Sequence, residues 1–272
     1  MALKLFKYMI FIEKFFLPSE SSRVYPYRIL YSKMLDVVSF TPVTIFYGSN
    51  GSGKSTLLNV IAEKMDIRHK TLGNSSPYFD DFVKECAFEM TTNYMNSRFI
   101  RSEDVMEAIA KMRHETKDVI NEIRKLQGSV AVDKVDGTKY NLMGENEMRI
   151  VMQKYNELPD QYSNGETAML FFKNIFEPDS LYMLDEPENS LSPRLQLSLK
   201  ELIEKWSYQL NCQFIIATHS PFLLSIKYAT VYNLDHCPSD VCNWSELENM
   251  RTYYDFFKEN MKLFEKNGKA GN

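Results

Sequence analysis

The chain has 272 residues, of which 44% are hydrophobic and 25% are charged. This composition is that of an ordinary globular protein and excludes collagen-like, disordered and coiled-coil chains. With 32 Lys and Arg against 36 Asp and Glu, the net charge of −4 does not indicate a basic protein that coats nucleic acid, although local basic patches are compatible with it. Four scattered cysteines are too few for a disulfide framework and indicate a reducing compartment.

The N-terminal stretch, residues 1–17, is apolar but carries charges at Lys4, Lys7, Glu13 and Lys14. Its longest uncharged run is far shorter than the roughly 20 apolar residues of a membrane-spanning helix. We therefore predict a buried strand at this position. The absence of an export signal or membrane segment predicts a cytoplasmic protein without a membrane partner.

A glycine-rich loop follows a short β-branched and aromatic run at residues 41–47 and precedes an apolar run that begins at Leu57. The order strand, loop, helix and the pattern Gly-x-x-x-x-Gly-Lys-Ser are those of a P-loop. Such a loop directs its amides, and the positive end of the next helix, at phosphate oxygens. We predict nucleotide binding by the loop; the alternative is a plain Gly/Ser-rich turn. The binding residues would be Gly48, Ser49, Asn50, Gly51, Ser52, Gly53, Lys54, Ser55 and Thr56.

Two residues of this loop have specific predicted tasks. Lys54 would reach the β- and γ-phosphates and so take part in catalysis. The Ser55 hydroxyl would occupy one ligand position on Mg²⁺. The predicted cofactors are therefore ATP and Mg²⁺.

An acidic pair ends a second apolar run, at residues 180–187, where Asp185 and Glu186 precede Pro187. The run fits a buried strand of a parallel sheet, whose carboxyl edge is where ligands bind in open α/β folds. We predict that Asp185 holds Mg²⁺ together with Ser55, and that Glu186 orients and deprotonates the attacking water. Without the P-loop in the same chain, a solvated turn would be the better interpretation of the pair.

A histidine, His219, follows a third apolar run at residues 213–218. It would reach the same sheet edge as Asp185 and could bind a γ-phosphate or the attacking water. The alternative is an ordinary capped or surface histidine.

The segment Tyr162-Ser163-Asn164-Gly165-Glu166 lies about 20 residues before the acidic pair and resembles the signature motif of ABC-type ATPases. P-loop, signature, acidic strand, a segment at 189–193 similar to the D-loop, and the switch histidine occur in the order of that family. The amino-acid sequence at 185–193 and 217–224 resembles that of bacterial "AAA family" ATPases, which are ABC-type proteins related to SMC and recombination ATPases. The resemblance implies an α/β P-loop NTPase fold, with an ABC-ATPase-like mixed sheet, flanking helices and an inserted helical lid.

In that family two subunits pack head to tail around two ATP molecules. The resemblance therefore implies an ATP-dependent homodimer in which Ser163, Gly165 and Glu166 of one subunit contact the nucleotide held by the other. Ser163 can also cap the helix predicted at 166–176, with Glu166 completing a capping box, and the two roles are compatible. No clear Q-loop glutamine is present; residues 98–103 are the best counterpart, with Glu103 as the candidate.

The rest of the chain predicts one domain, residues 1–272, with a lid inserted at 69–158. Within the lid, apolar residues recur at helical spacing over 103–127, which predicts one or two amphipathic helices. A hairpin is predicted at 130–142 around Asp136-Gly137, and another helix follows Pro193.

Two smaller features have competing interpretations. Tyr25 or Tyr27 could stack on adenine, but a core or surface role is favoured among sixteen tyrosines. His236, Cys237 and Cys242 could suggest zinc, but they lack a fourth spaced ligand and are better taken as loop residues.

The leading function is an ATPase whose dimer controls a protein partner, and the resemblance suggests DNA repair or anti-phage and toxin-associated defence. A nucleotide-gated scaffold with little turnover and the ATPase subunit of a transporter are the alternatives. Binding of nucleic acid is left open, because net charge cannot reveal a basic groove.

Overall fold

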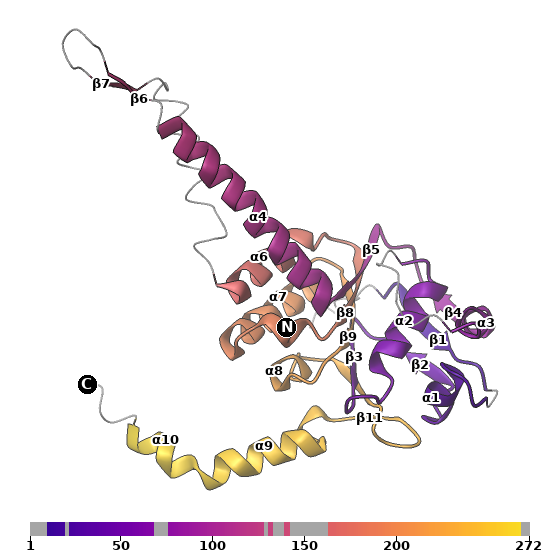
Figure 1. Cartoon of the computed structure of the whole chain (residues 1–272). Helices are drawn as coiled ribbons and strands as arrows, with labels where there is room; N and C mark the ends of the chain where they lie inside the picture. Colours follow the sequence, from indigo (N-terminus) through magenta and orange to yellow (C-terminus); the bar gives the residue numbers. More distant parts are fainter. Residues whose placement is uncertain are drawn as a thin grey trace, which may run out of the picture.

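A computed structural model describes residues 10–19, 22–67, 76–127, 130–132, 139–141 and 163–267. Its centre is a six-stranded sheet in the order β11–β10–β3–β9–β8–β5 (Figure 1). Five strands are parallel, and only the edge strand β11 is antiparallel to its neighbour. The strands are β3 (Val43–Tyr47), β5 (Asn96–Arg101), β8 (Ser180–Asp185), β9 (Gln213–Ala217), β10 (Thr230–Asn233) and β11 (Asp240–Cys242).

The three central strands β3, β9 and β8 are buried at every residue. This is expected for parallel strands that are covered on both faces, and it explains their uninterrupted apolar runs. Successive side chains enter opposite cores: Ile45 packs in the cluster on one face of the sheet and Phe46 in the cluster on the other. The predicted mixed α/β sheet is thereby confirmed.

A smaller antiparallel sheet packs beside the first, in the order β2–β1–β4. Its strands are β1 (Ile12–Phe16), β2 (Val37–Ser39) and β4 (Ala87–Met90). The buried Gln213 side chain ties the two sheets together, because it accepts from the amides of Phe11 and Ile12 and donates to the carbonyls of Ile12 and Thr41. The strand expected within residues 1–17 is present as β1, while residues 1–9 lie outside the described part.

Helices cover both faces of the large sheet. One side carries α1 (Tyr27–Tyr31), α2 (Lys54–Lys64) and α3 (Phe79–Glu85), together with the small sheet. The other side carries α6 (Asn164–Ile175), α7 (Pro193–Gln209), α8 (Pro221–Leu224) and the first turns of α4 (Ser102–Gln127). A 3-10 turn, η2 (Pro187–Ser190), follows β8 and contacts α4 and α6.

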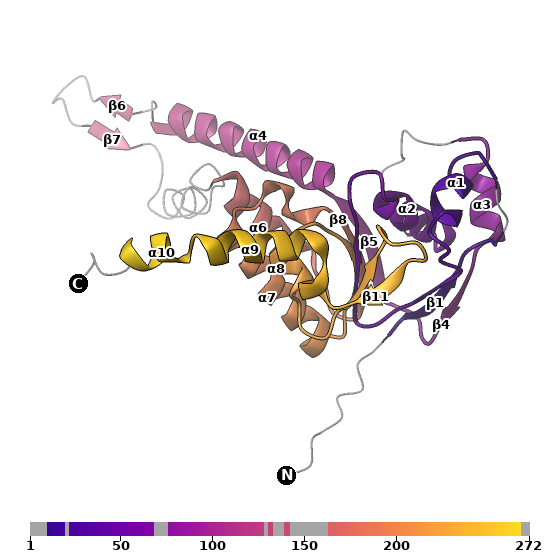
Figure 2. The ribbon, with the colours of Figure 1, turned by 90° about the horizontal axis from the view of Figure 1, so that it is seen from below.

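The long helix α4 extends away from the sheet, with the strands β6 (Val130–Val132) and β7 (Lys139–Asn141) at its tip (Figures 1 and 2). The segment predicted as one or two helices is thus a single helix. β6 and β7 pair antiparallel, as a hairpin requires, and the Asp136-Gly137 turn lies outside the described residues. The predicted insertion at 69–158 also contains β4 and β5, which belong to the two sheets, so among its described residues only those of α4, β6 and β7 project.

The C-terminal segment forms an arm beyond β11. It consists of η3 (Trp244–Glu246), α9 (Glu248–Glu259) and α10 (Met261–Asn267). Figure 2 shows α9 and α10 following one another away from the sheet. In the described part of the chain, no helix is long and apolar enough to cross a membrane.

Candidate active site

The glycine-rich loop joins β3 to α2 at the carboxyl edge of the large sheet. Gly51 (φ 82°) and Gly53 (φ 103°) adopt left-handed backbone conformations that favour glycine. The buried Lys54 folds back over the loop, where its Nζ donates to the carbonyls of Gly48 (2.7 Å) and Ser49 (3.1 Å). Burial lowers the pKa of Lys54, and this effect is partly opposed by the nearby carboxylates of Glu186 and Asp185.

A second support for the loop comes from Asp235, just after β10. Both of its carboxylate oxygens accept from the Ser49 amide at 2.8 Å, and Oδ1 also accepts from the Ser49 hydroxyl at 2.7 Å. Asp235 thereby fixes the first turn of the loop. Sequence reasoning missed this residue, because only the pairing of β10 with β3 brings it to the loop.

The predicted magnesium ligands lie side by side. The Ser55 hydroxyl, at the first turn of α2, donates to Asp185 Oδ1 at 3.1 Å. Burial raises the pKa of Asp185 to about 6; the hydrogen bond from Ser55 opposes this shift, nearby Glu186 adds to it, and Arg101 and Lys54 oppose it. A buried carboxylate next to a hydroxyl is a pair of hard oxygen donors, which suits Mg²⁺ bound with phosphate and water as its remaining ligands.

The predicted base and the predicted switch histidine also face each other. Glu186 Oε1 lies 3.7 Å from His219 Nε2, and Glu186 Oε2 accepts from Asn189 Nδ2 at 3.0 Å. Burial lowers the pKa of His219; the charge of Lys54 contributes to this, while Glu186 and Asp235 oppose it. Among the described residues His219 Nε2 is buried without a hydrogen-bond partner, which suits a side chain that binds something outside the protein.

A cavity of about 430 Å³ opens at this point. The loop lines one wall of it and Glu186 another, and Ile29 of α1 closes it on the side of the small sheet. Ile29 is held there because it packs against Gly53, where any side chain would collide with it. The described structure thus brings Lys54, Ser55, Asp185, Glu186 and His219 to one edge of one sheet.

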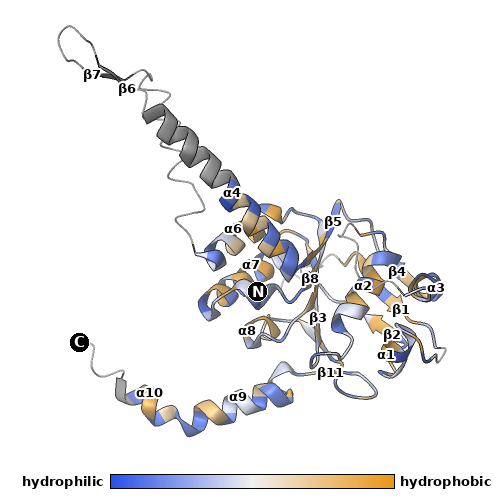
Figure 3. Ribbon diagram, in the orientation of Figure 1, coloured by the Kyte–Doolittle hydropathy of each residue, from blue (hydrophilic) through white to orange (hydrophobic). Residues whose placement is uncertain are grey.

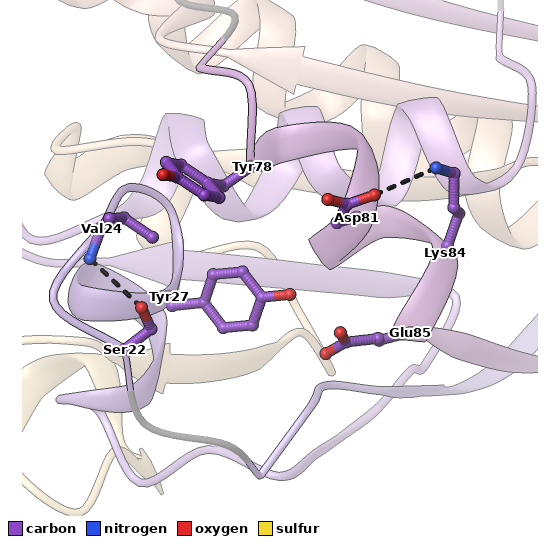
Figure 4. A pocket seen from close by; sticks show the side chains of 7 residues that line it. All are labelled: Ser22, Val24, Tyr27, Tyr78, Asp81, Lys84 and Glu85. Atoms are coloured by element: carbon purple, nitrogen blue, oxygen red, sulfur yellow. Dashed lines mark hydrogen bonds and ion pairs between the residues drawn. The ribbon is translucent and has the colours of Figure 1, made fainter.

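The tyrosines considered for adenine lie elsewhere. Tyr27 is buried edge-on against Phe82, and Tyr25 stacks on Phe79. Tyr27 also borders a separate cavity of about 550 Å³. Figure 4 shows its ring pointing into that cavity, with Tyr78 across from it and the Asp81–Lys84 ion pair beyond. Their position favours the core role over contact with a nucleotide in the P-loop cavity.

In the segment 98–103, the counterpart considered for the Q-loop, residues 98–101 belong to β5, which ends beside Asp185. The side chain that reaches the site is Arg101, whose Nη2 donates to Asn59 Oδ1 at 3.0 Å and whose charge lowers the pKa of Asp185. Glu103, the sequence candidate, is exposed at the start of α4. Arg101 was missed because no local pattern marks it.

Glu188, in η2, is a further residue that the sequence did not reveal. The residue is half-buried with its carboxylate turned inward, and its Oε1 accepts from the Thr218 hydroxyl (2.6 Å) and from the amides of His219 (2.8 Å) and Ser220 (3.1 Å). Burial raises the pKa of Glu188, and these donors oppose that shift. A single carboxylate therefore holds the backbone that carries His219.

We expect Glu188→Ala to destabilise the protein by about 2–4 kcal/mol, because it leaves the His219 amide and the Thr218 hydroxyl without their acceptor. Glu188→Gln keeps an acceptor oxygen and should cost clearly less. Urea unfolding of both variants measures the difference. Equal losses would show that the hydrogen bonds to this loop do not stabilise the fold.

The signature-like residues lie at the start of α6, away from the P-loop cavity. Ser163 and Glu166 form a capping box: the Ser163 hydroxyl accepts from the Glu166 amide at 3.3 Å, and Glu166 Oε2 accepts from the Ser163 amide at 2.8 Å. These bonds lower the pKa of the Glu166 carboxyl. Gly165 is buried against Leu195, where a side chain would collide. Tyr162 lies outside the described residues.

The residues considered for zinc do not assemble. His236 Nδ1 lies 3.0 Å from Asp240 Oδ1, and Cys237 is exposed. Over the described ranges, no group of three or more His, Cys, Asp or Glu side chains could hold a metal ion by itself. His236 and Cys237 lie in the loop between β10 and β11, whereas Cys242, expected in a loop, is the last residue of β11.

Known proteins resemble the chain over most of its length. A family model described as "AAA domain, putative AbiEii toxin, Type IV TA system" matches residues 147–225. A putative ABC transporter ATP-binding protein of Methanosarcina acetivorans is 29% identical over 70% of this chain and 68% of its own. The probable ABC transporter ATP-binding protein p29 of Mesomycoplasma hyorhinis is 27% identical over 73% of this chain and 77% of its own.

Among solved structures, the SMC head domain from Thermotoga maritima aligns with a TM-score of 0.41 at 13% identity, over 86% of this chain and 99% of that one. A putative metal-chelate type ABC transporter in an inward-facing conformation aligns with a TM-score of 0.43 at 14% identity, over 90% and 88%. The sequence matches, taken with the P-loop and the acidic strand at one sheet edge, show that the chain is similar to ABC-type P-loop ATPases.

Proposed function

We propose that this chain, as a single ATPase domain over residues 1–272, binds Mg-ATP in the P-loop cavity and hydrolyses it. The observation that carries the proposal is that the loop, the Ser55–Asp185 pair and the Glu186–His219 pair meet at one sheet edge, where the loop and Glu186 line one cavity. These groups supply what phosphoryl transfer to water needs: positive charge for the phosphates, oxygen ligands for a metal, and a carboxylate beside the site of attack.

Each residue then has one task. The amides of residues 48–56 and the ammonium of Lys54 bind the phosphates, with Lys54 exchanging the loop carbonyls for phosphate oxygens. Ser55 and Asp185 would hold Mg²⁺, which neutralises charge on the phosphates when bound. Glu186 accepts a proton from the attacking water, and His219, neutral at pH 7, donates from its ring to the γ-phosphate or to that water.

We further propose that hydrolysis takes place in a head-to-tail homodimer. Ser163 and Gly165 lie outside the P-loop cavity of their own subunit, and the start of α6 presents helix amides that suit an anion. A phosphate held by a second subunit would satisfy them. Ser163, Gly165 and Glu166 are thus assigned to nucleotide contact in trans.

The direct test is steady-state phosphate release from ATP with Mg²⁺, together with nucleotide binding by Lys54→Ala. We expect this substitution to weaken ATP binding by about 30-fold or more, because it removes a buried charge that faces the phosphates. Lys205→Ala, which removes an exposed lysine of α7, is the matched control and should bind normally. Equal affinity of both variants for ATP would contradict phosphate binding at this loop.

For biology, we propose control of a protein effector, in toxin-associated or anti-phage defence or in DNA repair. The first of these is supported by the matching family model, whose description names a putative toxin of a toxin–antitoxin system. The protein that co-purifies with Glu186→Gln in ATP would identify the effector. Salt-dependent DNA binding by the same form would indicate a nucleic-acid partner.

Two other functions use the same residues. A nucleotide-gated scaffold would bind ATP with very slow turnover, with or without its partner. An ATPase subunit of a transporter is supported by the names of the related proteins, and it would co-purify with an integral membrane protein.

A further inference from the structure

The C-terminal arm, residues 248–267, carries a dense group of exposed apolar side chains. Seven large ones are between 51% and 63% exposed within twelve residues. They are Tyr253, Tyr254, Phe256, Phe257, Met261, Leu263 and Phe264. Figure 3 shows hydrophobic and hydrophilic residues alternating along α9 and α10, as in an amphipathic helix with one face unused by the core. Such concentrated apolar surface marks an interaction site.

These side chains form one continuous surface. It begins at Met250, which is buried in the main core, and the next residues at helical spacing are exposed. The surface also crosses the junction between the two helices at Asn260, because the rings of Phe257 and Phe264 contact each other at 5.9 Å. The arm therefore presents a single apolar face along both helices.

We propose that this arm pairs with the same arm of a second copy of the chain, independently of nucleotide. At about 200 Å² for each large side chain, the exposed fractions of the seven residues correspond to roughly 700–800 Å². A stable protein interface buries about 800 Å² on each partner. The face thus matches the area that one dimer interface needs.

The charges of the arm fit a second copy. Four acidic and four basic residues cancel over this segment: Glu248, Asp255, Glu259 and Glu265 against Arg251, Lys258, Lys262 and Lys266. Two identical arms therefore do not repel each other. A helix that lies on a lipid surface usually has a polar face rich in Lys and Arg, and the balanced charge of this arm does not favour that occupant.

The arms can pair antiparallel about a twofold axis, which is the usual symmetry of a closed dimer. When two arms cross between Lys258 and Glu259, Tyr253 of one lies level with Phe264 of the other, and the apolar faces meet along both helices. The charged residues of the arm then lie on the opposite, outward face.

Sedimentation of the full-length chain, without nucleotide and with EDTA, tests the proposal. We expect twice the mass of 31.8 kDa for the wild type, and dimerisation about 100-fold weaker for the double substitution Phe257→Asp and Phe264→Asp. The matched control, Met95→Asp with Tyr228→Asp, replaces two exposed apolar residues outside the arm and should remain dimeric. Circular dichroism checks that each variant is folded.

A monomeric wild type at about 100 μM, or a dimer that the phenylalanine substitutions leave unchanged, would overturn the proposal. So would a monomer that binds lipid vesicles through the two phenylalanines. The wild-type result does not depend on ATP hydrolysis, and Lys54→Ala should still dimerise, so failure of the proposed ATPase function would be seen separately.

Discussion

We expect the substitution Glu186→Gln to slow ATP hydrolysis by about 10³-fold and to leave ATP binding intact. Glu186 lines the P-loop cavity and faces His219, so its carboxylate is placed to take a proton from a water at the γ-phosphate. A positioned general base contributes about 10²–10⁴-fold. Gln has the same length and can still accept from Asn189, so the change removes the base and preserves the shape of the site.

The measurement is phosphate release in a single turnover with enzyme in excess, which separates chemistry from product release. Binding of a fluorescent ATP analogue by Glu186→Gln should match the wild type. Glu201→Gln, an exposed position on α7, is the matched control and should hydrolyse ATP normally. Unchanged hydrolysis by Glu186→Gln would remove Glu186 from the role of base.

The part of the site that the sequence predicted lies in continuous segments. The P-loop and the acidic strand end are each formed by adjacent residues, and the requirement for glycine at Gly51 and Gly53 can be seen without a structure. His219 follows the same logic, because apolar parallel strands bring their carboxyl ends to one edge. The capping box at Ser163 and Glu166 is also local, and its predicted hydrogen bonds are present.

The residues that sequence reasoning missed act across the fold. Asp235 reaches Ser49 only because β10 lies next to β3, and Arg101 reaches the site only because β5 lies next to β8. Glu188 looks like a surface residue of an acidic turn, yet its carboxylate turns inward and binds the loop that carries His219. Strand order and burial are long-range properties, and a single sequence without a structure does not contain the pairings that create them.

The arm illustrates a different limit. Its amphipathic pattern resembles that of core helices such as α7, and periodicity alone does not distinguish a face packed on the sheet from a face left exposed. In α7 the apolar face covers the sheet through Leu199 and Ile203. In α9 only Met250 is buried. The difference depends on the direction in which the chain leaves β11.

Replacing Asp185 by Asn should make the nucleotide-free protein more stable and abolish Mg²⁺-dependent hydrolysis. Burial raises the pKa of Asp185 from its ordinary value of 3.8 to about 6. Below both values the group is protonated whether the chain is folded or unfolded, and its ionisation does not lower the free energy of unfolding. Above both values it is ionised in each state, and the folded state bears the full cost of a buried charge. The wild type therefore loses stability as the pH rises from about 4 to 6, and the loss persists above pH 6.

Asn has no proton to lose and can still accept from Ser55, so the variant avoids this cost. From the difference between the two pKa values, we expect the free energy of unfolding of the variant to exceed that of the wild type by about 3 kcal/mol at pH 8 and by about half of that at pH 5. Urea unfolding in EDTA at both pH values measures the gain, and Asp36→Asn, an exposed position, is the control that should show none. Hydrolysis by Asp185→Asn should fall by about 10²-fold or more, because a carboxylate ligand of Mg²⁺ is lost. A variant less stable than the wild type at pH 8 would show that the ionised Asp185 is stabilised by its neighbours rather than held for its function at a cost to folding.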